Sequence, residues 1–236
     1  MSEVPGGFDV DRRPVAVRTN GLAKSYGDAA ALSPIDLEVR AGDRVAIIGP
    51  NGSGKTTLLR MLAGLLDASE GDAEIAGNAP GSIPARAALS YLADQPVFYD
   101  DLSVIEHLEY IARLHGVDEW RPLADDLVER VVLTARIDDL PTTFSRGLRQ
   151  KAAICLAFVR PFEVLIVDEP FVGLDTPGRN ALLSLFDDAQ SGGRTLLVAT
   201  HELTTVAKSD RVIALRSGEV VYDGGPDTDL HDLVVG

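Results

Sequence analysis

Short apolar runs alternate with helical patterns along most of this chain, and each run has the length of a β-strand. Residues 164–167 (VLIV) and 196–199 (LLVA) are apolar at every position, which is typical of central strands covered on both faces. Further strands are predicted at 15–19, 35–39, 44–48, 73–77, 89–93, 211–215 and 219–224. Because strands alternate with helices, we expect an α/β fold with a largely parallel sheet.

Between Pro96 and Pro161 the strand pattern nearly disappears. Ser103 and Glu106 have the spacing of a capping box, and a helix with apolar residues at helical spacing should follow them. These apolar positions are Ile105, Leu108, Ile111 and Leu114. A second helix is predicted over 120–135 and a third from about 146. We therefore predict a helical lobe inserted into the α/β core.

Length and composition set limits on the class of protein. The 236 residues suffice for one large α/β domain, and residues 1–14, rich in glycine and charge, are expected to be flexible. The longest apolar run, AAICLAFV, is far shorter than the ~18 residues of a membrane-spanning helix. The single cysteine, Cys155, excludes an intrachain disulfide, which favours a cytosolic protein. Any membrane role therefore needs a partner.

The chain carries a formal net charge of −14. Such a charge is unfavourable for a broad nucleic-acid surface, because duplex binding depends on Lys and Arg. It also repels any polyanionic ligand, so we expect such a ligand to bind at a concentrated positive site.

The stretch GPNGSGKTT, residues 49–57, has the spacing of a phosphate-binding loop (P-loop) between a predicted strand and a predicted helix. Its glycines allow the backbone to wrap around an anion. Lys55 would bind the β- and γ-phosphates, and the Thr56 hydroxyl would ligate Mg²⁺. The candidate nucleotide-binding residues are Gly49, Pro50, Asn51, Gly52, Ser53, Gly54, Lys55, Thr56 and Thr57.

Asp168 and Glu169 end the apolar strand 164–167. Ligands of open α/β folds bind at this carboxyl edge of the sheet. Beside a phosphate-binding loop, Asp168 would hold Mg²⁺ directly or through water. Glu169, one residue further, would orient or deprotonate an attacking water.

The stretch FSRGLRQKAA, residues 144–153, is a second candidate anion site. It places Ser145 and Gly147 between arginines at the start of a predicted helix, where free backbone N–H groups and the helix dipole favour a negative ligand.

These motifs occur in a particular order: Tyr26, the P-loop, Gln95, the 144–153 stretch, Asp168 and Glu169, Asp175 in VGLDTP, and His201 in ATHEL. This order closely resembles the nucleotide-binding subunit of ATP-binding cassette (ABC) transporters, over nearly all of residues 15–225. The 144–153 stretch corresponds to the signature motif of that family, whose usual form is Leu-Ser-Gly-Gly-Gln.

The resemblance implies a P-loop NTPase core with a mainly parallel sheet, an N-terminal antiparallel β portion and an inserted helical subdomain. One ABC ATPase domain would span 15–236, with its core at 15–95 and 161–236 and its helical subdomain at about 96–160. The resemblance also implies roles for single residues. Tyr26 would stack on adenine, Gln95 would contact Mg²⁺ or the attacking water, His201 would contact the γ-phosphate, and Asp175 would lie between two cassettes.

In this family two cassettes dimerise head to tail, so that the signature motif of one closes over the ATP of the other. The resemblance assigns this role to Ser145, Arg146, Gly147 and Gln150. Arg146 replaces a glycine and Leu148 the glutamine of the usual form. Arg146 could add charge near the phosphate or near the membrane subunit, or this half-site could be weaker. A signature with a basic residue followed by glycine, as in Arg146-Gly147, resembles those of cassettes that serve exporters.

We therefore expect an ATPase that uses ATP and Mg²⁺ and pairs with a second copy of itself or a related cassette. It would power a membrane-spanning permease from the cytoplasmic face of the membrane, without binding nucleic acid, and the form of its signature motif favours an exporter. A soluble cassette, for example of the iron–sulfur assembly type, and a weakly hydrolysing regulatory cassette are the alternatives. Selectivity for the cargo would reside in the permease.

Overall fold

The computed structural model describes residues 13–226. Most of the predicted flexible N-terminus, residues 1–12, lies outside the described residues, as do residues 227–236.

A six-stranded sheet forms the centre of the molecule, in the order β5-β6-β7-β3-β8-β9. Neighbouring strands from β5 to β8 are parallel, and β9 is antiparallel to β8. The strands are β3 (Arg44–Ile48), β5 (Leu89–Leu92), β6 (Val164–Asp168), β7 (Thr195–Ala199), β8 (Arg211–Arg216) and β9 (Glu219–Gly224). The predicted α/β fold with a largely parallel sheet is confirmed.

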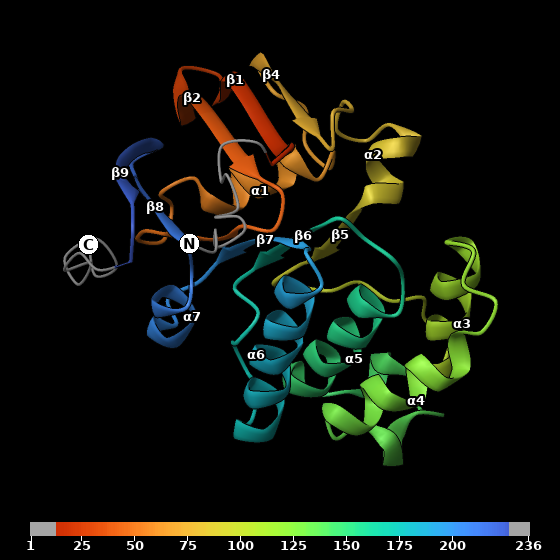
Figure 1. Ribbon diagram of the computed structural model, residues 1–236. Helices are drawn as coiled ribbons and strands as arrows, with labels where there is room; N and C mark the ends of the chain where they lie inside the picture. The colour runs from red at the N-terminus through yellow and green to blue at the C-terminus, as the bar shows by residue number, and fades with distance from the viewer. Residues whose placement is uncertain (1–12, 227–236) are drawn as a thin grey trace, which may run out of the picture.

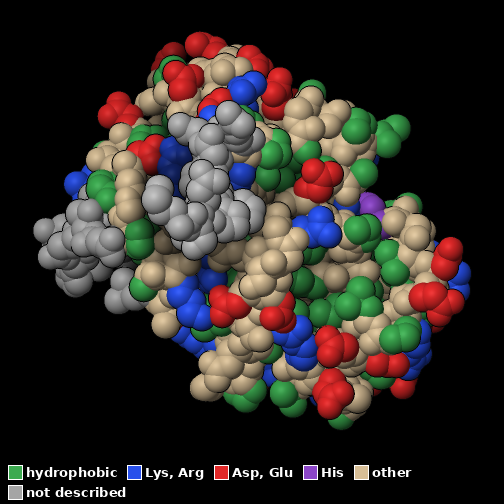
Figure 2. All heavy atoms as spheres, in the orientation of Figure 1, with side chains coloured by type: hydrophobic (Ala, Val, Ile, Leu, Met, Phe, Trp, Pro, Cys, Tyr) green, Lys and Arg blue, Asp and Glu red, His purple; other side chains and the backbone are tan. Residues whose placement is uncertain are grey.

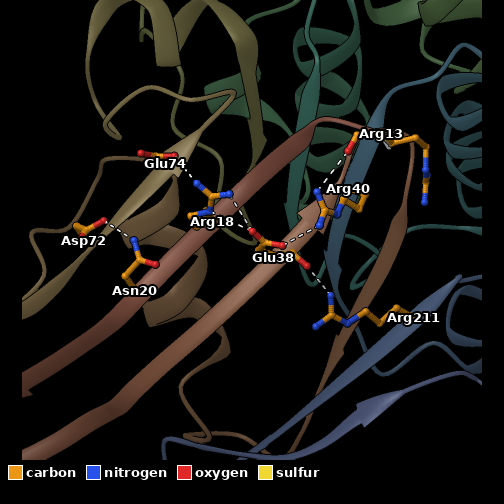
Figure 3. A network of polar contacts seen from close by, with 8 residues as sticks. All are labelled: Arg13, Arg18, Asn20, Glu38, Arg40, Asp72, Glu74 and Arg211. Carbon is orange, nitrogen blue, oxygen red and sulfur yellow. Dashed lines mark hydrogen bonds and ion pairs between the residues drawn. The ribbon is translucent and has the colours of Figure 1, made fainter. Parts of the chain in front are cut away.

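A second, antiparallel sheet has the order β2-β1-β4 and comprises β1 (Val15–Tyr26), β2 (Ala29–Arg40) and β4 (Glu70–Ile75). It lies above the central sheet in Figure 1. Helix α1 (Lys55–Leu62) contacts strands of both sheets. Because strand side chains alternate between faces, Val45 and Ile47 of β3 join this core. On the outer face of the antiparallel sheet lie pairs of oppositely charged side chains, including Arg18 of β1 with Glu38 of β2 (Figure 3).

Helices cover the other face of the central sheet (Figure 1). They are α3 (Val104–Leu114), α4 (Trp120–Arg130), α5 (Arg146–Phe158) and α6 (Thr176–Ser191). Leu165 and Val167 of β6 point into this second core. The remaining helices are α2 (Ile83–Ala88), α7 (Leu203–Ala207) and two 3₁₀ turns at Thr134–Arg136 and Pro141–Thr143.

Two details of the helical region differ from the sequence prediction. The stripe that α3 buries is Val104, Leu108 and Ala112, whereas Leu114 is 63% exposed. The expected stripe is wrong at Leu114 because the neighbouring row of residues spaced four apart, 104, 108 and 112, is the one that packs against α4 and α5. Helix α4 ends at Arg130, five residues early, where Val132 adopts φ 57°. The capping box is confirmed, since Glu106 accepts a hydrogen bond of 2.7 Å from the backbone N–H of Ser103.

Candidate functional site

The P-loop, residues 49–57, connects β3 to α1 at the carboxyl edge of the central sheet. Gly52 and Gly54 have φ of 80° and 104°, a region that residues with a Cβ rarely adopt. A Cβ on Gly49 would lie 2.1 Å from the carbonyl oxygen of Leu215. Glycine is therefore required at position 49 for steric reasons and at 52 and 54 for backbone reasons.

Lys55 begins α1, and its side chain is only 6% exposed. Its ammonium donates hydrogen bonds to the carbonyls of Gly49, at 2.7 Å, and Pro50, at 3.2 Å. Burial lowers the pKa of this ammonium. The negative charges of Glu169 and, to a smaller extent, Asp168 oppose the shift. The positive charge of Lys55 is thus held inside the P-loop.

Asp168 is the last residue of β6 and is 1% exposed. Its Oδ1 accepts a hydrogen bond of 3.2 Å from the Thr56 hydroxyl. Burial raises the pKa of the Asp168 carboxyl, and the Thr56 hydrogen bond acts against it. A hydroxyl and a carboxylate, predicted separately from sequence as metal ligands, therefore meet at one point.

Glu169 follows directly and adopts φ 45°, which is uncommon outside glycine. Its backbone N–H donates to the Ala199 carbonyl at 2.9 Å. Its Oε1 lies 2.9 Å from Nε2 of His201, beyond β7, and 3.8 Å from Nζ of Lys55. Burial raises the pKa of the Glu169 carboxyl, with His201 and Lys55 opposing the shift. The structure thus brings together three residues that the sequence assigned to catalysis.

A cavity of about 400 Å³ connects these groups. Its lining residues are Ala31, Asn51, Gly52, Ser53, Gly54, Lys55, Thr56, Thr57, Asp94, Asp168 and Glu169. Asp94, just after β5, was missed by sequence reasoning, although an acid at a strand end is the signal that found Asp168. Its neighbour Gln95 is exposed and does not line the cavity.

The cavity suits a nucleotide and Mg²⁺. Glycine backbone surrounds it, and the buried Ser53 hydroxyl has no hydrogen-bond partner. Hydroxyl and carboxylate oxygens are the ligands that Mg²⁺ prefers. Residues 13–226 contain no cluster of three or more His, Cys, Asp or Glu able to hold a metal, but Mg²⁺ usually binds through one or two side chains together with substrate phosphates.

Tyr26 lies at the end of β1, opposite Ala29 of β2, and is 58% exposed. It does not line the cavity, whereas Ala31 on the same hairpin does. The exposed ring therefore lies on the hairpin that forms part of the cavity wall.

The signature residues lie at the start of α5. Ser145 is the exposed N-cap, and its Oγ accepts a hydrogen bond of 3.4 Å from the Leu148 N–H. Arg146 pairs with Asp94 at 2.7 Å. Gly147 lies against the backbone of Gly173. Gln150 is 2% exposed, so it is the one predicted signature residue that this chain does not present at its surface.

Asp175 is the N-cap of α6. Its Oδ2 accepts a hydrogen bond of 2.9 Å from Lys151 on α5, and its Oδ1 accepts one from the Gly178 N–H. The Lys151 hydrogen bond lowers the pKa of the Asp175 carboxyl. The loop before α6 is thereby joined to the signature helix.

A P-loop at the edge of a parallel sheet, with Asp168 and Glu169 on the next-but-one strand, defines a P-loop NTPase fold. A sequence model described as "ABC transporter" matches residues 32–172. The chain therefore belongs to the ABC transporter family and has the architecture of its ATP-binding subunit.

Individual proteins agree with this assignment. The chain is 33% identical to the ABC-type transporter ATP-binding protein EcsA of Bacillus subtilis, with 84% of this chain and 83% of EcsA covered. It is also 33% identical to the SkfA peptide export ATP-binding protein SkfE of the same organism, with 88% of each covered. A solved ATP-binding subunit of an ABC transporter superposes with a TM-score of 0.85 at 28% identity, covering 93% of this chain and 98% of that one. Within residues 13–226, no helix has the length and apolar character needed to cross a membrane.

Proposed function

We propose that this protein is the ATP-hydrolysing subunit of an ABC exporter and works as a head-to-tail dimer with a second copy or a related cassette. One observation carries the proposal. Ser145 is exposed at the start of α5 and does not line the phosphate cavity of its own chain. The two candidate phosphate-binding elements, the P-loop and the start of α5, are therefore separate on one chain, which suits a site shared between two molecules.

In the proposed dimer the P-loop of one copy holds the ATP phosphates, and Ser145 with the N–H of Gly147 from the other copy contacts the γ-phosphate. ATP therefore joins the two copies, and hydrolysis removes that contact. The free energy of ATP acts as a population shift between closed and open dimers.

Hydrolysis needs positioning and charge neutralisation more than covalent chemistry. Lys55 would neutralise the β- and γ-phosphates. Glu169 would accept a proton from the attacking water, and His201, 2.9 Å from it, would contact the γ-phosphate. When bound, Mg²⁺ would be held by Thr56 and Asp168 and would add positive charge at the phosphates. Gln95 does not line the cavity of this chain and would have to move toward it to serve as a further ligand. Tyr26 would stack on the adenine.

A membrane-spanning permease is the proposed partner, which would place the protein on the cytoplasmic face of the membrane. An apolar groove of about 670 Å³ supports a docking site for it. The groove lies between β5 and the helices; Val97, Leu65 and Leu114 lie on its walls, each more than 60% exposed. Figure 2 shows hydrophobic side chains on the surface beside α2 and α3. The name of SkfE, a peptide export ATP-binding protein, supports export.

We also propose that residues 15–236 act as one cassette, with a core of 15–95 and 161–236 and a helical subdomain of about 96–160. Asp175, at the start of α6, would contact the second cassette.

The test of this function is the oligomeric state of Glu169→Gln with ATP, measured by analytical ultracentrifugation. A variant that binds ATP without hydrolysing it should sediment as a dimer with ATP and as a monomer without it. Glu163→Gln makes the same change outside the cavity and should give no trapped dimer. If Glu169→Gln binds ATP yet stays monomeric at every concentration, alone and with its permease, the shared site is wrong.

A further inference from the structure

Arg146 links the signature motif to the phosphate cavity of its own chain. Its Nη2 lies 2.7 Å from Oδ1 of Asp94, and both side chains remain partly exposed, at 53% and 33%. Arg146 is the first residue of α5, whereas Asp94 follows β5 and lines the cavity. The pair joins two residues that are 52 positions apart in the chain.

The charge balance of the cavity gives this pair a consequence for ligand binding. The lining residues include three carboxylates, Asp94, Asp168 and Glu169, but only one cation, Lys55. A nucleotide brings further negative charge. An unpaired Asp94 would therefore weaken anion binding, and Arg146 cancels that charge at the cavity wall.

The start of α5 also contacts the loop before α6. A Cβ added to Gly173 would lie 3.5 Å and 3.6 Å from Cγ and Cδ of Arg146, so the stem of the arginine passes beside this loop. The next residue, Gly147, lies so close that its Cβ would meet the Gly173 carbonyl oxygen at 2.3 Å. One turn further on, Lys151 binds Asp175. The start of α5 is thus attached on one side to Asp94 and on the other to the loop before α6.

We propose that Arg146 is a positioning residue that acts within its own chain: it neutralises Asp94 at the wall of the phosphate cavity and holds the signature motif in a fixed place relative to that cavity. This proposal rests on the proposed ATP site. It implies that the P-loop half-site and the signature half-site of one molecule are coupled through a single ion pair. The side chain that replaces a glycine then supports ATP binding in its own chain instead of reading the ATP of the second copy.

The experiment is a double-mutant cycle on the affinity for ATP. Binding of ATP is measured by isothermal titration calorimetry in EDTA, with protein dilute enough to be monomeric. Arg146→Gln should weaken binding about two- to five-fold, the range expected for one partly exposed charge pair. Asp94→Asn should bind at least as tightly as the parent protein, and the double variant should regain the parent affinity. Arg149→Gln removes an exposed cation three residues further along α5 and should leave the affinity unchanged.

Recovery of ATP affinity in the double variant distinguishes neutralisation of Asp94 from other roles of Arg146. A double variant that binds as weakly as Arg146→Gln overturns the proposal, as does an Arg146→Gln affinity equal to that of the parent. In a Glu169→Gln background with saturating ATP, where every variant is fully occupied, loss of the dimer on both Arg146→Gln and the double variant would instead assign Arg146 to the second copy's phosphate. A parent protein that fails to bind ATP at all would overturn the proposed function itself. Thermal unfolding of each variant shows whether it is folded.

Discussion

The Nε2 of His201 lies 2.9 Å from the Oε1 of Glu169, although the two residues follow different strands. The contact arises because β6 and β7 are parallel neighbours, with Asp168 opposite Ala199 in the register. Residues just beyond these two strands must therefore emerge together at one edge of the sheet. Glu169 consequently sits between His201 and Lys55, which lies 3.8 Å from the same oxygen.

ATP turnover should be lost as the pH is lowered, and the midpoint of this loss should lie above the pKa of an ordinary glutamate. Burial raises the pKa of Glu169 above its usual value of 4.5. The carboxylate form of Glu169, the proposed general base, is therefore lost as the pH falls through this raised value. A pH profile of kcat for the parent protein measures the effect, and circular dichroism over the same range serves as the control for folding.

Glu169→Gln should reduce kcat about 10²–10⁴-fold, the usual contribution of a general base, and should remove this acidic limb from the residual rate. A parent profile that stays flat down to pH 4.5, or a glutamine variant with the parent rate, would exclude Glu169 as the base.

Gly147→Ala should destabilise the protein. The added Cβ would lie 2.3 Å from the carbonyl oxygen of Gly173, and forcing atoms into a packed site costs about 1–3 kcal/mol. The better helix propensity of alanine offsets about 1 kcal/mol of this cost. Urea unfolding gives the net value.

Arg149→Ala, an exposed change on the same helix, is the control and should stay within about 0.5 kcal/mol of the parent. Equal stability of the parent, the control and Gly147→Ala would show that moving the α5 N-terminus away from the Gly173 loop costs no more than the about 1 kcal/mol that the helix propensity of alanine returns.

Asp187→Asn should cost more stability than the same change at the next residue. Asp187 pairs at 2.9 Å with Arg44, whose side chain is 1% exposed. Asp188 pairs with Arg130, which is 28% exposed. Loss of a carboxylate beside a buried cation leaves an uncompensated charge; because Asp187 itself is 45% exposed, we expect about 1–3 kcal/mol, against less than about 1 kcal/mol at the surface pair.

The pH dependence of this difference has a definite sign. A hydrogen bond from Lys208 and a weaker contribution from that of Arg44 lower the pKa of Asp187 below its usual 3.8. The stabilisation is therefore present at neutral pH and is lost as the pH falls through the lowered value. Urea midpoints of the two variants at pH 7 and pH 3 test it, and equal losses at both positions at pH 7 would contradict it.

Tyr26→Ala should weaken ATP binding, and Tyr26→Phe should not. The exposed ring on the β1–β2 hairpin is available to stack on adenine, a contact worth about 1–3 kcal/mol or roughly 5- to 150-fold in affinity. Calorimetric titration with ATP measures the change. Because phenylalanine keeps the stacking face, a similar loss in both variants would point to the hydroxyl group instead.

The sequence alone determined the elements and the main residues around the cavity. Apolar runs such as 164–167 identified central strands, because a strand covered on both faces has apolar residues at every position. The glycine spacing of residues 49–57 identified the P-loop, because a backbone that wraps an anion needs φ values open mainly to glycine. These are local requirements, and local sequence records them.

Only the tertiary structure decided which side chains meet. Arg146 reaches Asp94, and Lys151 reaches Asp175, because the order of the strands and the packing of α5 place them side by side. The same packing turned Leu114 of α3 outward and left Gln95 beside the cavity instead of on its wall. A hydrophobic pattern records how each element prefers to fold and which face it buries, but the distance between two charged side chains depends on how separate elements are arranged in space.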